Sequence, residues 1–242
     1  MDYTLRYYRD WAGSDDLTTF EVAQRQTDLQ IRAHSDLSRV ALKLVKRLRA
    51  DVESYADAHP GFIESLVAWP DDPAAPPVVR EMLVATRAYA VGPMAAVAGA
   101  IAEAVGREIL KSSPEVIVEN GGDVFLLMNR PVTLMLYSGE ESPFNRRVLV
   151  KLNAPGQPRG VCTSSAKVGP SLSFGETDAV LTIADNAAVA DAAATALGNL
   201  VRRAEDVAGV LELEQARGVL RGAVITIGQT LGAYGEVQLA KP

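Results

Sequence analysis

The chain has 242 residues, of which 48% are hydrophobic and 22% are charged. This length and composition suffice for a hydrophobic core and exclude a disordered, collagen-like or coiled-coil chain. The formal net charge of −6 argues against nucleic acid as the principal partner, because phosphate backbones are bound by basic patches. A single cysteine, Cys162, excludes a disulfide framework, and two histidines, His34 and His59, argue against a histidine-rich zinc centre.

Neither an export signal nor a membrane span is expected. Six charged residues lie within the first 20 positions, so an apolar signal core cannot form there. The longest largely apolar run without charges, residues 88–102, is short of a bilayer span and is interrupted by Gly92, Pro93 and Gly99. We therefore expect a cytoplasmic protein that makes no membrane contact.

The first third of the chain is predicted to form strands followed by a long helix. Aromatic content and alternation of apolar and polar residues favour strands at 3–8, 17–23 and 28–33. Apolar residues then recur at three- and four-residue spacings over residues 37–55, the pattern of an amphipathic helix. The sequence at 59–61, His-Pro-Gly, ends it.

The rest of the chain alternates helices with strands. Residues 70–77 are too rich in proline for a helix or a central strand and predict a loop. Two β-type runs flank an Asn-Gly-Gly sequence at 120–122, which is a strong hairpin signal. The remaining predicted elements are helices at 78–90, 93–111, 187–203 and 205–216, hairpin strands at 115–119 and 123–128, strands at 132–137, 147–152 and 178–183, a loop at 153–160, and a final pair of strands at 223–227 and 236–239.

This order of elements predicts an α+β fold. Strands come first, helices follow, and the second half mixes both, so mixed or antiparallel sheets should be layered with helices. No internal repeat is present. We expect one domain over residues 1–242.

The Asn120-Gly121-Gly122-Asp123 turn is the first candidate for chemistry. Its two glycines let a ligand or a strand approach the backbone, and their N–H groups can face a phosphate or a ring carbonyl. These four residues are therefore candidate cofactor-binding residues. The alternative is an ordinary hairpin turn.

A second candidate segment is rich in hydroxyl groups and glycine. Residues 160–165 and 169–175 contain donors of the kind that hold anions, among them Thr163, Ser164 and Ser165. The alternative is a turn in which serine and threonine cap their own backbone. Within the first of these segments, Cys162 is expected to be a small buried residue.

The third candidate lies in an alanine-rich helix, with Asp185 or Asn186 as its predicted cap. Asp191 and Thr195 are four residues apart, which places a carboxylate and a hydroxyl on one helical face. Such oxygen ligands suit Mg²⁺. The alternative is a tightly packed helix of small residues with Asp191 paired elsewhere.

These three segments, in this order, resemble the ApbE superfamily of FAD:protein FMN transferases. The similarity is greatest to shorter ApbE-like proteins without an export signal, and it implies an ApbE-like, T-fold-related architecture. The segments that carry the resemblance are residues 27–29, 91–103, 118–123, 162–165, 190–195 and 218–222.

The resemblance implies FAD and Mg²⁺ as cofactors. It implies magnesium ligands at Asp191, Thr195 and the main-chain oxygens of Ala194 and Ala100, and a flavin contact at Glu103. A cation spreads the charge that develops on the FAD pyrophosphate, and Asp191 is in addition the candidate base for an incoming threonine hydroxyl.

Two positions depart from the transferase pattern. Pro170 stands where a histidine is usual, and Val97 stands where the transferases have an aspartate. One hypothesis is a flavin-binding protein with Mg²⁺-dependent FMN transfer from FAD or FAD hydrolysis. The alternatives are a non-catalytic binding or assembly module and a site for another ring such as a pterin. The alanine-rich helices are compatible with a homodimer.

Overall fold

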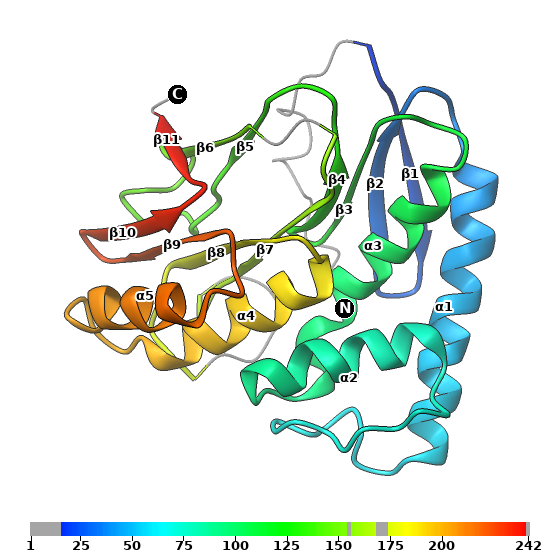
Figure 1. Cartoon of the computed structure of the whole chain (residues 1–242), viewed down its shortest axis with the longest axis horizontal. Helices are drawn as coiled ribbons and strands as arrows, with labels where there is room; N and C mark the ends of the chain where they lie inside the picture. Colours follow the sequence, from blue (N-terminus) through cyan, green and yellow to red (C-terminus); the bar gives the residue numbers. More distant parts are fainter. Residues whose placement is uncertain (1–15, 154–155, 168–173, 241–242) are drawn as a thin grey trace.

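A computed structural model of the chain describes residues 16–153, 156–167 and 174–240. The strand predicted at 3–8, the position of Pro170 and most of the 169–175 segment lie outside these ranges. The prediction of an α+β fold is confirmed: two antiparallel sheets are layered with helices (Figure 1).

The larger sheet has eight strands in the order β1-β2-β3-β4-β7-β8-β9-β10, and neighbouring strands pair antiparallel. A smaller sheet has the order β11-β6-β5 and is also antiparallel. The strands are β1 (Thr18–Gln24), β2 (Thr27–Ala33), β3 (Val116–Asn120), β4 (Asp123–Leu127), β5 (Val132–Met135), β6 (Leu149–Leu152), β7 (Arg159–Ser164), β8 (Ala179–Ala184), β9 (Gly222–Ile227), β10 (Thr230–Gly235) and β11 (Gln238–Ala240).

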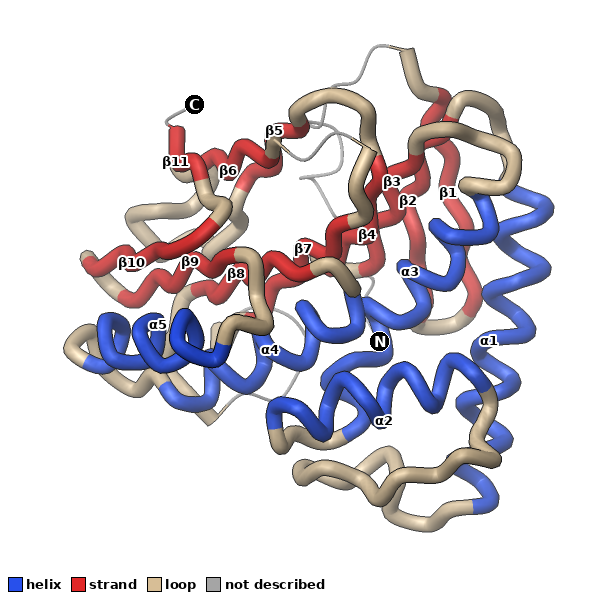
Figure 2. Tube along the Cα trace, viewed as in Figure 1, coloured by secondary structure: helices blue, strands red, loops and turns tan. Residues whose placement is uncertain are grey.

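The helices gather on one side of the large sheet, and the small sheet lies on the other (Figure 2). Helices α3 and α4 run along the middle strands, while α1 packs on β1 and α5 on β10. The helices are α1 (Ser38–Ala58), α2 (Pro77–Tyr89), the 3₁₀ helix η2 (Pro93–Ala96), α3 (Val97–Ile109), α4 (Ala187–Leu200) and α5 (Asp206–Arg217).

The central strands are buried on both faces and separate two hydrophobic cores. Because successive side chains point to opposite faces of a strand, Phe125 and Cys162 belong to the core under the helices, whereas Leu126 and Val161 belong to the core under the small sheet. This alternation also places Asp123, two residues before Phe125, on the helix side of the sheet.

The second half of the chain contains one strand that was not predicted and one wrong prediction of strand pairing. The segment at 160–165, for which a turn was considered, forms most of β7 in the middle of the large sheet. Strand β9 pairs not with residues 236–239 but with β10, through a two-residue turn at Gly228, whose φ is +55°. The glycines of β10 conceal its strand pattern, and β11 joins β6 in the other sheet.

The helix predicted at 93–111 is divided into η2 and α3. In the part of the chain that the structure describes, no single helix is long and apolar enough to cross a membrane. The α2 helix passes that test only together with residues 93–109, and this pair is bent by 105°.

Candidate functional site

The glycine turn between β3 and β4 is a two-residue hairpin turn. Asn120 pairs with Asp123, and Gly121 and Gly122 take φ values of +71° and +104°, which favour glycine. A Cβ on Gly122 would lie 2.7 Å from Thr163 Oγ1. That hydroxyl donates to the carbonyl oxygen of Gly122 at 3.1 Å, so the turn is fastened to the end of β7.

Helix α4 approaches α3 closely because small residues face each other. A Cβ on Gly99 would lie only 2.3 Å from the carbonyl oxygen of Ala187. This approach brings Asp191 to the first turn of α3, where its Oδ2 accepts the N–H of Gly99 at 2.9 Å. The side chain of Asn120 donates to the carbonyl oxygen of Ala98 at 3.1 Å, which ties the glycine turn to the same helix end.

Asp123 and Asp191 form a pair of neighbouring buried carboxyl groups. They are 7% and 8% exposed. Asp123 Oδ1 accepts the N–H of Thr163 at 3.2 Å. Burial raises the pKa of Asp123 well above its usual range, and the nearby charge of Asp191 raises it further. Burial likewise raises the pKa of Asp191 to about 7, against the lowering effect of the N–H groups of Gly99 and Ala98.

No cationic side chain among the described residues forms an ion pair with either carboxyl group. Cys162 lies beside them, with its Sγ 3.3 Å from the carbonyl oxygen of Ala187, and burial raises the pKa of its thiol. The described residues contain no group of three or more His, Cys, Asp or Glu side chains arranged to hold a metal ion. A cation at this centre would therefore depend on hydroxyl and main-chain oxygens as well.

The magnesium ligands implied by the resemblance lie around this centre. Ala100 directly follows Gly99, the residue that Asp191 contacts. Thr195 is half-buried one helical turn after Asp191, and Ala194 is fully buried. The structure thus places Asp191 and the segment of Ala100 together, and the ligand set itself remains a prediction.

Glu103 is buried between α3 and α4, and both of its carboxylate oxygens already accept hydrogen bonds from other residues of the protein. Its Oε2 accepts the N–H of Ala187 at 2.5 Å, and its Oε1 accepts both Nε and Nη2 of Arg107 at 2.8 and 2.6 Å. Burial raises its pKa, and the hydrogen bond from Ala187 opposes that rise. Glu103 caps the start of α4, and a flavin contact for it stays a prediction.

The hydroxyl residues at the end of β7 are only partly buried. Thr163 contacts the glycine turn, Ser164 is half-buried at the last position of the strand, and Ser165 Oγ accepts the N–H of Lys167 at 3.0 Å. They lie next to the glycine turn and leave part of their surface accessible.

The sequence-based prediction missed the contact of Asp123 with Cys162, whereas Asn186, one of the two predicted caps of α4, is confirmed as the cap. Because Val124 pairs with Val161, Asp123 stands opposite Cys162 in the sheet. Asn186 caps α4, since its Oδ1 accepts the N–H of Val189 at 2.9 Å. The strand register could have revealed the first contact only once β7 was recognised.

Comparison with known proteins finds a matching family model and similar proteins. A family model described as "AbpE bacteria" matches residues 9–228. A UPF0280 protein of Methanopyrus kandleri is 39% identical over 223 residues, which cover 90% of each chain. A UPF0280 protein of Methanocella arvoryzae is 38% identical over 216 residues, covering 88% of this chain and 86% of the relative.

Two solved structures share the fold at low sequence identity. The apo flavinyl transferase ApbE of Pseudomonas stutzeri has a TM-score of 0.59 and 15% identity, covering 90% of this chain and 93% of the other. The flavin transferase ApbE of Vibrio cholerae has a TM-score of 0.56 and 15% identity, with coverages of 90% and 96%.

Proposed function

We propose, from the premise that the chain belongs to the ApbE-like superfamily, that it binds FAD beside the glycine turn and acts on its pyrophosphate with Mg²⁺. The observation that carries this proposal is the pair of buried carboxyl groups, Asp123 and Asp191, held where the turn, β7 and α4 meet. Buried charges without a cationic partner are costly, so such a pair indicates a site that a cation completes.

The donor set fits a hard cation. Asp191, Thr195 and the main-chain oxygens of Ala194 and Ala100 would hold Mg²⁺, and all of these are oxygen donors. When bound, the metal spreads the negative charge that develops on the FAD pyrophosphate. The closest support in the geometry is the contact of Asp191 with Gly99, one residue before Ala100.

The chain's own residues supply binding and proton transfer. Gly121 is exposed at the turn, so its backbone is accessible to a ligand, and Thr163, Ser164 and Ser165 offer hydroxyl groups beside it. Asp191 is the candidate base that would accept the proton of the incoming hydroxyl group or water. The acceptor of FMN is then the hydroxyl group of a polypeptide in a transfer, or water in a hydrolysis.

A non-catalytic binding module is the competing function. The observation that favours it is that Asp191 already accepts hydrogen bonds from two main-chain N–H groups, which satisfies much of its carboxylate. Val97 also favours a binding module, because the first residue of α3 is here an apolar side chain packed on the core and not an aspartate.

Calorimetric titration with FAD, with and without Mg²⁺, tests the binding. We expect FAD to bind more tightly with Mg²⁺, and Asp191→Ala to abolish the dependence on Mg²⁺. Asp206→Ala is the control, because Asp206 lies in the first turn of α5 and its side chain accepts hydrogen bonds from the nearby Arg202 and Arg203. If FAD at high micromolar concentration gives no heat and a pterin raises the thermal stability, the site binds a pterin and not a flavin.

Release of AMP separates the enzyme from the binding module. Incubation with FAD, Mg²⁺ and threonine-containing peptides should release AMP, and this release should require Asp191. Flavin bound covalently to the peptide identifies transfer, and free FMN identifies hydrolysis. Tight FAD binding without AMP release would establish the binding module.

A further inference from the structure

One main-chain amide at the start of α3 is held from both sides. The carbonyl oxygen of Ala98 accepts the side-chain Nδ2–H of Asn120 at 3.1 Å, and the N–H of Gly99 is donated to Asp191 Oδ2 at 2.9 Å. This carbonyl and this N–H belong to the same planar peptide group, the one that joins residues 98 and 99. Asn120 and Asp191 are therefore linked through a single rigid group.

Helix α3 needs an acceptor at this position. The N–H groups of the first turn of a helix have no partner within the helix, and Ala96, the N-cap of α3, has no side chain that can accept them. Asp191 of α4 takes the place of a capping residue when it accepts the N–H of Gly99. The orientation of the amide thus determines the direction from which the carboxyl group of Asp191 is held.

Asn120 is placed to fix that orientation. Its side chain is 6% exposed and points toward the helices, because it lies two residues after Val118, which belongs to the core on the helix side. A carbonyl oxygen can only accept, so the nitrogen of the side-chain amide faces Ala98. A hydrogen bond accepted by a carbonyl polarises the peptide group and strengthens the bond that its N–H donates. Asn120 therefore acts on Asp191 through the amide.

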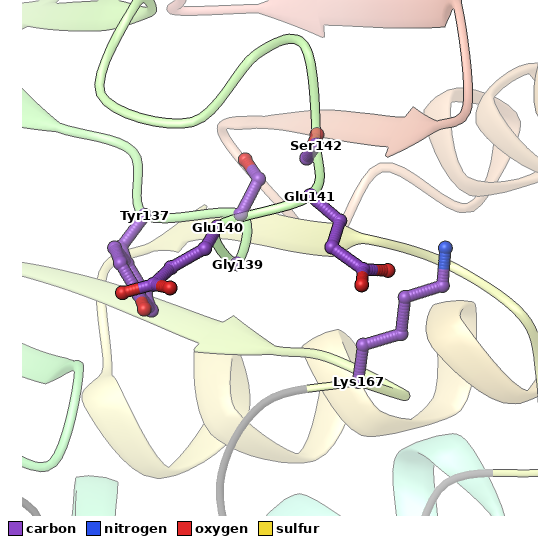
Figure 3. Close-up of a pocket in the computed structure, with 7 residues that line it drawn as sticks. Tyr137, Gly139, Glu140, Glu141, Ser142 and Lys167 are labelled. Carbon is purple, nitrogen blue, oxygen red and sulfur yellow. The ribbon is translucent and has the colours of Figure 1, made fainter.

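A pocket elsewhere in the molecule holds its buried carboxylate differently. This pocket of about 300 Å³ lies between the loop that follows β5 and Lys167, with Glu141 and Lys167 extending toward each other (Figure 3). Lys167 forms an ion pair with the buried Asp178. At Asp191 no cationic side chain among the described residues forms such a pair, so the position of this carboxylate depends on main-chain N–H groups.

We infer that Asn120 is a positioning residue of the Mg²⁺ site: through the amide of residues 98 and 99 it holds Asp191 and the adjoining carbonyl of Ala100 in the arrangement that binds the cation. This inference rests on the proposed function, because it assigns a further residue to the same metal. Asn120 also begins the glycine turn. It therefore connects the segment proposed to bind FAD with the carboxylate proposed to bind Mg²⁺.

Thermal unfolding of the full-length protein at increasing Mg²⁺ concentration, without FAD, tests the metal role. A ligand of the native state raises the thermal midpoint, so the half-saturating Mg²⁺ concentration can be read from this rise. Asn120→Leu removes the donor and keeps a side chain of similar size. We expect it to raise the half-saturating concentration at least about tenfold, as removal of a group that orients a metal ligand typically does. Asn120→Ser, which is too short to reach Ala98, should have the same effect and replaces the leucine variant if that variant does not fold.

Asn186→Ala is the matched control. It removes another side-chain amide that bonds the start of a helix, the cap of α4, and leaves the amide of residues 98 and 99 untouched. This variant should lower the thermal midpoint without Mg²⁺ and leave the half-saturating concentration unchanged. Equal losses of Mg²⁺ affinity in the Asn120 and Asn186 variants would reduce Asn120 to a structural residue and overturn the inference.

The amide proton of Gly99 gives a second measurement, which needs no ligand. Its chemical shift and its exchange with solvent, followed by NMR on ¹⁵N-labelled protein, report the hydrogen bond to Asp191. Asn120→Leu should move this signal upfield and accelerate its exchange, whereas Asn186→Ala should change neither. An unchanged Gly99 signal in the Asn120 variants would contradict the inference whatever the Mg²⁺ result. If the signal changes but Mg²⁺ does not stabilise the wild type, the link between Asn120 and Asp191 exists without a metal site, and the proposed function fails together with the positioning role.

Discussion

Asp185 lies just before α4 and Asp191 lies within its first half, six residues later, and the two carboxyl groups have opposite environments. Asp185 is half-exposed and accepts hydrogen bonds from Arg221 Nε and Nη2, at 3.0 and 2.5 Å, and from Arg159 Nη1 at 2.9 Å. Its hydrogen bond with Arg221 lowers its pKa. Asp191 is buried beside a second carboxyl group, and burial raises its pKa to about 7.

The contrast separates a carboxylate that stabilises the fold from one that the fold holds at a cost. Around Asp185, the guanidinium groups of Arg221 and Arg159 offset the charge of the carboxylate, so the fold itself compensates it. Around Asp191 the protein provides N–H groups and small residues but, within the described residues, no cation. Groups retained in such an unfavourable state are found preferentially at functional sites, which is why the proposed chemistry is assigned to Asp191 and not to Asp185.

The largest expected effect is the pH dependence contributed by Asp191. Its folded pKa of about 7 lies above the unfolded value near 3.8, so the folded state holds the proton more tightly. The associated stability is complete below the unfolded pKa and is lost as the pH rises through about 7, a change of about 4 kcal/mol.

Urea unfolding at pH 5 and pH 8 measures this dependence. Wild type should be less stable at pH 8, and Asp191→Asn should lose most of the difference. The neighbouring Asp123 contributes a remaining pH dependence of the same sign, since its pKa is also raised by burial. If the free energy of unfolding changes equally between pH 5 and pH 8 in wild type and variant, Asp191 is already ionised at pH 5.

The close approach that holds Asp191 in place predicts the second largest effect. Gly99→Ala puts a methyl group 2.3 Å from the backbone oxygen of Ala187, which cannot move aside as a side chain can. We expect a loss of about 3 kcal/mol in the free energy of unfolding and separation of α3 from α4.

Gly209→Ala in α5 is the matched control. A Cβ on this glycine meets nothing within 4 Å, so the helix preference for alanine should raise stability by about 0.5–1 kcal/mol. If both variants lose the same stability, the contact between α3 and α4 is not the reason for the glycine.

Removal of the buried cap on α4 has a smaller expected effect. Glu103→Ala leaves the buried N–H of Ala187 without its acceptor and frees Arg107, at a cost of about 2 kcal/mol. Glu108→Ala on the same helix, which breaks only an exposed pair with Lys111, should change stability by less than about 0.5 kcal/mol. Thermal and urea unfolding of both variants distinguish a structural cap from a surface residue.

The smallest expected effect is at Asp185. Asp185→Asn removes the half-exposed ion pair with Arg221, worth about 0.5–1 kcal/mol, and one of the two carboxylate partners of Arg159, whose pair with Glu236 remains. Because the pKa of Asp185 is lowered, this stability is present above the unfolded pKa and disappears as the pH falls through the folded pKa. The variant should therefore be less stable than wild type at pH 7 and equal to it in acid, opposite in sign to Asp191→Asn.

Much of the fold could be predicted because its signals are local. The periodic residues 37–55 fall within α1 apart from Leu37, which is its N-cap, and the glycines at 121 and 122 form the hairpin turn that their sequence indicates. Strand β10 and the start of β7 escaped because their glycines break the alternation of apolar and polar residues, and only pairing with neighbouring strands stabilises them.

The candidate site divides in the same way. The sequence by itself determined which residue types were available: a carboxylate and a hydroxyl one helical turn apart, a glycine turn, and a hydroxyl-rich strand end. Only the tertiary structure decided that Asp191 meets Gly99 and Asp123, that Glu103 turns toward Ala187, and that Lys167 closes a pocket with the loop after β5. Each of these contacts joins residues distant in sequence, and the burial that shifts their pKa values exists only after the strands and helices have packed.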